Sequence, residues 1–366
     1  MIKLLDTLHR WTGGLIGLVL ALMGLSGTIL LYEHLWIGVP GAGDPLRGDL
    51  ATVAATTEKL MAMPGAQGII YADERFGLHQ LRFGGQGNAG AGAYASQSGD
   101  IAARWASQWE RPELWIFDFH HHLFAGDSGE WVIGVAGLCG LFFVISGAIL
   151  WWRTRKTFQL RLWPKRMSRP AIVMHHRDLG IIVAPLLLIS VVTGTMMIFR
   201  PFAMAMIAPF GSPAEAAKAM EPPKYRSGPL AAKPDYTAML TEARRRFPDA
   251  EFRILSLPRK AGDPIGLRMK QPAEWLPNGR TTLAFDAATG NVLGARDALA
   301  MPSGAQAFNK AFPIHASKVG GWTWRILLTI SGLSLTLLGS LAVWTFWFKR
   351  PKPAKRAAKK AALAST

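Results

Sequence analysis

The chain has 366 residues, half of them hydrophobic, with one cysteine and a formal net charge of +17. A single cysteine, Cys139, excludes a disulfide scaffold, an iron–sulfur cluster and a cysteine-rich zinc site. A large positive charge is common in nucleic-acid-binding proteins, but here Lys and Arg gather in short segments beside long apolar ones. This distribution excludes nucleic acid as the expected partner and indicates a membrane protein.

Four segments are long, apolar and nearly free of charge. Each has 21 to 23 residues, and about 20 apolar residues cross a bilayer as a helix. The first is longer than the apolar part of a signal peptide, so we expect it to be retained. The predicted spans are Trp11–Tyr32, Trp131–Trp152, Leu179–Phe199 and Ile326–Phe348.

Basic residues predict how the chain is oriented. Eight Lys and Arg lie between Arg153 and Arg177, and seven lie in the tail that starts at Lys349. Both segments are on the same side as the N-terminus, so the positive-inside rule places both termini in the cytoplasm. The tail is expected to contact anionic membrane lipid or to stay solvated.

The predicted fold class is a membrane α-helical bundle of four helices with an internal two-fold repeat and two extracytoplasmic α+β loop domains. In the second loop the patterns predict a helix over Tyr236–Phe247 and strands over Phe252–Leu257, Ile265–Met269 and Thr281–Phe285; in the first they predict strands over 68–72, 79–83 and 92–95. The expected units are 1–34 (N-terminus and first span), 35–129 (first periplasmic domain), 130–178 (second span and basic cytoplasmic loop), 179–200 (third span), 201–323 (second periplasmic domain), 324–348 (fourth span) and 349–366 (basic cytoplasmic tail).

A repeat places histidines at corresponding positions. His9 precedes two glycines by 4 and 18 residues, and His176 does the same. Eighteen residues are five helical turns, so each histidine shares a helix face with its glycines, where a flat group can approach the backbone. His120 and His315 each precede an even-numbered span, with a Gly-rich turn and Trp between.

Two histidines on each side of a four-helix bundle suit two six-coordinate haems. The alternative for any single histidine is an interfacial side chain facing lipid headgroups, but the repeat favours ligands. We therefore expect His9 with His176, and His120 with His315, to be the axial ligands of two haem b groups (iron-protoporphyrin IX). No C-x-x-C-H motif is present, so the haem would not be covalently attached.

Other residues remain candidates for the same sites. The outer-side alternative ligand is His34, next to Glu33, and register shifts could substitute His121, His122 or His175. His79 lies in an expected strand and is assigned no role. Arg10 and Arg177 follow proposed ligands; they could pair with haem propionates or serve as positive-inside anchors.

These motifs together resemble the PepSY-associated transmembrane proteins of bacterial iron uptake. The resemblance covers essentially the whole chain and rests on four ordered segments: Leu8-His9-Arg10-Trp11, His120 through Gly126 and Gly129, His176-Arg177 with Leu179-Gly180, and His315 with Gly320-Gly321. It implies PepSY-like modules in the loops, a place in the bacterial inner (cytoplasmic) membrane, and a role as a ferric siderophore reductase of the FoxB type.

The expected function is therefore electron transfer across the membrane. An unknown donor, a quinol or a cytoplasmic reductase, would reduce the cytoplasmic-side haem; the periplasmic-side haem would then reduce an Fe(III)–siderophore and release iron. No G-x-G-x-x-G motif stands in a strand–turn–helix unit, as a flavin or nicotinamide site requires. The alternatives are a haem conduit to another acceptor (quinone, copper or a periplasmic protein) and a non-redox PepSY-type binding protein.

Overall fold

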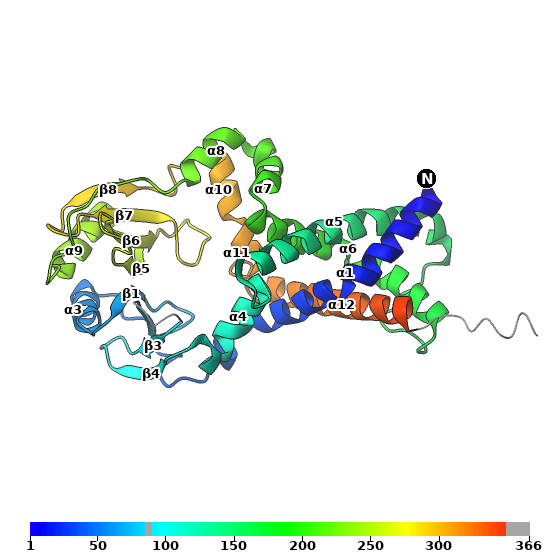
Figure 1. The fold of residues 1–366 in the computed structure, drawn as a ribbon, viewed down its shortest axis with the longest axis horizontal. Helices are drawn as coiled ribbons and strands as arrows, with labels where there is room; N and C mark the ends of the chain where they lie inside the picture. Colours follow the sequence, from blue (N-terminus) through cyan, green and yellow to red (C-terminus); the bar gives the residue numbers. More distant parts are fainter. Residues whose placement is uncertain (85–89, 349–366) are drawn as a thin grey trace, which may run out of the picture.

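The computed structural model describes residues 1–84 and 90–348. It consists of a bundle of four long helices with a sheet domain at one end (Figure 1). The long helices are α1 (Ile2–Leu30), α5 (Gly126–Thr154), α6 (Arg169–Ile198) and α12 (Gly321–Trp347). All four are long and apolar enough to cross a membrane, which confirms the four predicted spans. Each begins before the predicted span does, because its first turns are polar. The basic tail 349–366 lies outside the described residues.

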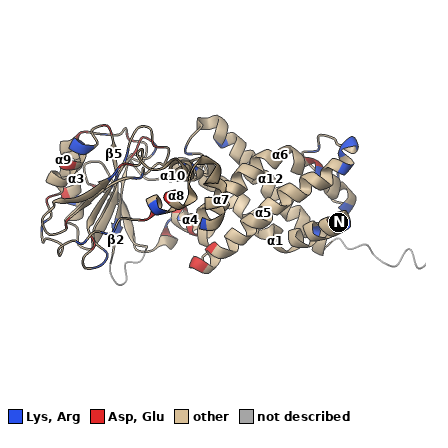
Figure 2. Cartoon of the chain, turned by 90° about the horizontal axis from the view of Figure 1, so that it is seen from above, with Lys and Arg blue, Asp and Glu red and all other residues tan. Residues whose placement is uncertain are grey.

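Small residues let the first and last long helices approach each other closely. A Cβ added at Gly24 of α1 would lie 2.5 Å from the Gly332 carbonyl oxygen of α12, and one added at Gly17 would lie 3.2 Å from the Gly339 carbonyl oxygen. Glycine at such crossings brings two helix backbones into van der Waals contact, which drives helix association in lipid. The middle of the bundle carries few charged residues, whereas Lys and Arg gather at the end with the N-terminus (Figure 2).

Both loops contribute to one sheet. The first supplies α3 (Leu50–Met61), β1 (Ala66–Ile70), β2 (His79–Phe83), β3 (Gly92–Ala95) and β4 (Ile101–Trp105), and the second supplies α9 (Tyr236–Arg246), β5 (Glu251–Ser256), β6 (Ile265–Lys270), β7 (Thr281–Phe285) and β8 (Val292–Arg296). The strand order is β4-β3-β2-β1-β5-β6-β7-β8. The two loop domains expected from the sequence are therefore corrected to one eight-stranded antiparallel sheet, joined where β1 pairs with β5.

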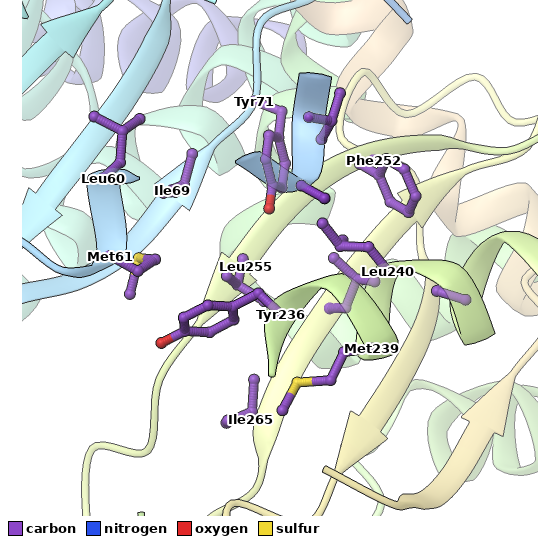
Figure 3. Packing of buried hydrophobic residues seen from close by; sticks show 14 of the residues in the cluster. Leu60, Met61, Ile69, Tyr71, Tyr236, Met239, Leu240, Phe252, Leu255 and Ile265 are labelled. Atoms are coloured by element: carbon purple, nitrogen blue, oxygen red, sulfur yellow. The ribbon is translucent and has the colours of Figure 1, made fainter. Parts of the chain in front are cut away.

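A single apolar core covers one face of this sheet. Helices α3 and α9 pack side by side there, and Leu60 of α3 and Leu240 of α9 lie with Ile69 and Leu255 in one cluster (Figure 3). The Glu58 carboxylate on α3 accepts a hydrogen bond of 3.1 Å from the Tyr236 backbone N–H at the start of α9. Each loop supplies one helix and four strands to this domain, so the single core is complete only when both loops are present.

Shorter elements join the sheet domain to the bundle. They are α2 (Glu33–Trp36), α4 (Pro112–His122), α7 (Arg200–Ile207), α8 (Pro213–Met220), α10 (Ser303–Asn309) and α11 (Ala311–His315), with short 3-10 turns at Gln108–Glu110, Arg155–Thr157 and Ala208–Phe210. The β1–β2 loop is fixed by Arg253, which donates to the Asp73 carboxylate at 2.7 Å. Arg75 in this loop donates to the Lys318 backbone oxygen at 2.7 Å, so it attaches the sheet directly to the start of α12.

The joint between the loops can be tested by a disulfide. Ile70 and Ile254 are partners in the β1–β5 ladder, at a position whose neighbours, Tyr71 and Arg253, carry the hydrogen bond. Non-hydrogen-bonded pairs have Cα atoms about 4.5 Å apart, which allows a disulfide. In a Cys139→Ser background, Ile70→Cys with Ile254→Cys is expected to form this disulfide on oxidation, as measured by peptide mass mapping.

The control pair is Ile70→Cys with Arg268→Cys. Arg268 pairs with Ile254 on the next strand, so it lies two strand spacings, roughly 10 Å, from Ile70. Crosslinking of the control pair as readily as the test pair would contradict the described register.

Candidate functional site

The four predicted histidines form two pairs at opposite ends of the bundle. The ring centroids of His9 and His176 are 6.2 Å apart, and those of His120 and His315 are 6.4 Å apart. Metal–imidazole bonds are about 2.0 Å, and a ring centroid lies about 1.1 Å behind its nitrogen, so two imidazoles on opposite sides of one metal have centroids roughly 6.2 Å apart. Both pairs match this spacing.

The elements explain why these residues meet. His9 and His176 lie near the starts of α1 and α6, the two helices that begin at the same end of the bundle. His120 and His315 close the short helices α4 and α11, which lie where the sheet domain meets the bundle (Figure 1). His120 lies beside Gly27 of α1. Gly27 is 18 residues after His9, which corresponds to about 27 Å along the helix.

Hydroxyl groups fix the orientation of three of the four imidazoles. Ser146 on α5 contacts His9 Nδ1 at 2.7 Å, and Ser26 on α1 contacts His120 Nδ1 at 2.9 Å. Thr193 on α6 contacts His315 Nδ1 at 3.1 Å. In each case the hydroxyl belongs to a different helix from the histidine, so the bond also joins two elements of the bundle.

The direction of these bonds determines the tautomer. Ser26, Ser146 and Thr193 each donate their hydroxyl hydrogen to the backbone oxygen four residues earlier, at 2.8, 2.6 and 2.6 Å. A hydroxyl has one hydrogen; with that hydrogen on the backbone oxygen, the hydroxyl oxygen accepts from the histidine and Nδ1 carries the proton. Nε2 is then unprotonated with a free lone pair, which is the form in which a histidine binds a metal.

A glycine follows each of these hydroxyl residues and makes room for the ring. A Cβ added at Gly27 would lie 2.9 Å from His120 Cε1, and one added at Gly194 would lie 2.9 Å from His315 Cε1. Gly147 has His9 Cε1 at 3.6 Å in the same way. The sequence predicted that Gly27 and Gly194 leave space for a flat group. The structure identifies this group as the imidazole of a histidine on another element.

The first two glycines of the repeat serve a different purpose. A Cβ added at Gly13 or Gly180 would meet no atom within 4 Å, and both glycines line a cavity of about 990 Å³ together with His9 and His176. Drug-sized ligands occupy cavities of roughly 300–1,000 Å³. Basic residues line the same cavity, namely Lys3, Arg10, Arg153, Arg169 and Arg177.

The second pair lies in a smaller cavity of about 280 Å³. His120 and His315 line it with Glu33, Glu130 and Lys318. Burial lowers the pKa of His120 to about 3 and that of His315 to about 4, so both imidazoles are neutral at physiological pH. Burial also raises the pKa of Glu33 and lowers that of Lys318, while the attraction between these two opposes each shift.

One layer of side chains separates the two cavities. Leu20 of α1, Val191 of α6 and Leu335 of α12 line both of them. The cavities therefore lie on either side of a shared apolar layer in the middle of the bundle. Any groups bound in them would be held apart by this layer.

The alternative ligands lie elsewhere or have other partners. His34 Nε2 accepts from the Arg325 guanidinium at 3.2 Å, and His175 Nε2 contacts the Leu162 backbone oxygen at 3.0 Å. His122 contacts the Asp118 carboxylate at 2.9 Å. His79 accepts from the Ala72 N–H in the sheet domain. His121 lines the second cavity beside His120, but its Nδ1 contacts Phe117 of its own helix.

The two arginines considered for anionic groups differ in their surroundings. Arg177 donates to the Asp178 carboxylate at 2.7 Å and to Thr157 at 2.8 Å. Arg10 is half-exposed and lies 3.7 Å from Asp6. Arg10 therefore has the freer guanidinium beside the larger cavity.

The Ser26 hydroxyl is expected to stabilise the bundle through His120. Ser26→Ala leaves the buried Nδ1–H without its partner, which costs about 1–3 kcal/mol. The control is Thr345→Ala, since Thr345 donates to Ala342 within its own helix. Thermal unfolding in detergent should show a lower midpoint for Ser26→Ala than for the control; equal midpoints would mean that Ser26 does not hold His120.

Comparison with known proteins gives a family. A family model described as the PepSY-associated TM region matches residues 7–350. No curated protein matches the chain. Since the match covers the four long helices and the sheet domain, the chain belongs to the family of proteins with a PepSY-associated transmembrane region.

Proposed function

We propose that this protein holds two haem b groups and carries electrons across the bacterial inner membrane to a ferric siderophore in the periplasm. The observation that carries the proposal is the pairing of His9 with His176 and of His120 with His315 at the spacing of two imidazoles on one metal. Three of these rings have Nε2 free, because Nδ1 donates to a hydroxyl.

The donor set suits haem better than a free metal ion. Among residues 1–84 and 90–348, no three His, Cys, Asp or Glu side chains gather as they would around a bound ion. Two imidazoles can fill only the axial positions of a six-coordinate metal, so the other four ligands must come from a non-protein group. The open space above Gly13 and Gly180 next to His9 and His176 suits a flat ring.

The residues of the chain then have distinct tasks. Haem held by His9 with His176 and by His120 with His315 would supply one-electron transfer. The hydroxyls of Ser26, Ser146 and Thr193 hold the imidazoles in the ligating tautomer. Leu20, Val191 and Leu335 would form the apolar layer between the two centres.

Charge supports the proposed orientation. The cavity of His9 and His176 is at the basic end of the bundle, which the positive-inside rule places in the cytoplasm together with the N-terminus. The sheet domain is then periplasmic, beside His120 and His315, where it can receive the iron chelate. The electron donor would be a quinol or a cytoplasmic reductase.

The strand order of the sheet supports an internal two-fold repeat, because the four strands of each loop run outward from the centre of the sheet in chain order.

Absorption spectroscopy tests the proposal directly. Detergent-purified protein, oxidised and then dithionite-reduced, should show b-type bands with two haems per chain by pyridine haemochrome. His9→Ala and His315→Ala should each remove one haem, whereas His34→Gln and His175→Gln should keep both. An absence of haem bands after expression with ample haem would rule out the proposal and favour a non-redox binding protein.

Two glycines provide a test of where the ring lies. Gly13→Val and Gly180→Val each place a Cβ that meets no protein atom within 4 Å, so folding should be unaffected. Each should nevertheless remove the haem of His9 and His176, because the side chain fills the space of the ring, and should leave the other haem bound. Gly48→Val, also in open space but in the first loop, is the control; two haems in all three variants would contradict this placement.

A further inference from the structure

One face of the sheet carries a cluster of arginines. Strand alternation places Arg82 of β2, Arg268 of β6 and Arg280 before β7 on the side opposite α3 and α9, since their neighbours Leu81, Leu267 and Thr281 are buried. Arg259, in the β5–β6 loop, is close enough to lower the pKa of Arg82 by charge repulsion. We name these four residues, Arg82, Arg259, Arg268 and Arg280, the basic face.

The arginines of the basic face lack acidic partners. Within residues 1–84 and 90–348, none of the four forms an ion pair. The charge of Glu274 acts on Arg268 and Arg280, but its carboxylate accepts from the Gln271 N–H, the Arg280 N–H and the Thr281 hydroxyl. The Nε atom of Arg280 is buried without a hydrogen-bond partner. Burial lowers the pKa of Arg82 and of Arg268, and the neighbouring Arg259 and Arg268 lower that of Arg82 further.

Short side chains leave room between these arginines. Gly68, Ser256 and Gly266 are partners in successive strands β1, β5 and β6, in the same row as Arg82. A Cβ added at Gly266 would meet nothing within 4 Å. Arg82 and Arg268 lie on strands three spacings apart and two residues out of register, roughly 16 Å in all, and Ile70 and Ile254 lie in the row of Arg268. The long arginine side chains can reach inward to a small molecule over Gly68, Ser256 and Gly266.

The rest of this sheet face is covered. At the β8 side, Arg296 donates to the backbone oxygens of Ala219 and Glu221, and Tyr225 lies against Gly294. At the β3 side, Tyr94 and Trp105 belong to a second apolar cluster. In the part of the chain that the structure describes, the uncovered area therefore spans only the central strands, which suits a small molecule better than a protein.

We propose that the basic face binds a small polyanion, specifically a ferric chelate whose ligands are carboxylate or catecholate oxygens. Arginine pairs with such oxygens through its planar fork of N–H groups. This inference rests on the proposed function, which is the reason for expecting iron in the chelate. The basic face itself recognises only the charge and the oxygen geometry of a ligand. It specifies the substrate class: anionic chelates are captured, and neutral ones of equal size are not.

The test compares two iron complexes of different charge. The full chain in non-ionic detergent is titrated calorimetrically with the triply anionic Fe(III) tris-catecholate and with the neutral Fe(III) tris(acetohydroxamate). The anionic complex should bind at least about tenfold more tightly at low salt, and this advantage should shrink at high salt. Equal affinity for the two complexes would overturn the inference.

Variants separate the basic face from net charge. Arg82→Gln with Arg268→Gln should remove the preference for the anionic complex, and Gly266→Leu should weaken its binding by filling the open space without changing the charge. Arg245→Gln with Arg246→Gln on α9 loses the same charge but removes arginines that pair with Glu242, so it should bind normally. Equal loss in this control would mean that the face has no specific role.

The inference and the proposed function can fail independently. The variant His120→Ala with His315→Ala should still bind the anionic complex, since the basic face is intact. Retained binding in protein without haem bands would leave the anion site standing and remove the electron-transfer function. Haem bands in a protein that shows no preference between the two complexes would leave the electron-transfer function standing and remove the anion site.

Discussion

The hydrogen bond from a histidine Nδ1 to a hydroxyl on another helix is the interaction on which the candidate site depends. Ser26, Ser146 and Thr193 each donate to their own helix and accept from a ring. Within a bilayer no water can replace such a partner, so the bond holds both the position and the tautomer of the ring. The adjacent glycine lets the ring lie against the helix backbone. The fourth ring, His176, has no such hydroxyl and instead hydrogen-bonds to the backbone of Leu338 on α12, which lines the same cavity.

A short chain of contacts attaches the sheet domain to the end of the bundle that holds His120 and His315. Arg253, almost fully buried in β5, holds Asp73, and Arg75 in the same loop reaches the backbone of Lys318. Lys318 is three residues from His315 and lines the same cavity. A ligand on the sheet and a group between His120 and His315 would therefore share one rigid connection.

The sequence predicted the elements better than it predicted their partners. The spans follow from apolar length, and the strands at His79–Phe83, Gly92–Ala95 and Thr281–Phe285 follow from alternation that matches the structure. Strands β4 and β8 were missed because their exposed edge positions lack a clear apolar alternation. The β1–β5 pairing was missed because it joins segments separated by two spans. Local sequence patterns predict strands but do not predict which distant strands pair.

The same distinction applies to the candidate site. The spacing of His9 and His176 from their glycines was visible in the sequence, yet the reason for Gly27 and Gly194 was not, because it depends on which element lies opposite. The Ser-Gly and Thr-Gly dipeptides were a signal that could have been used: each marks the place where a ring from another element lies. Within the triple histidine at 120–122, His120 contacts Ser26 on α1 and lies beside His315, an arrangement that the sequence alone does not distinguish from a shifted register.

The β1–β5 ladder also has a consequence for biosynthesis. The partner of β1 is made about 180 residues later, after two further helices have entered the membrane. At 5–20 residues per second, the free edge of β1 waits roughly 10–40 s for β5, and an unpaired strand edge is a template for association with other chains. The first loop must therefore be kept from aggregating during this interval, and the ribosome, by completing the second loop, determines when the domain can close.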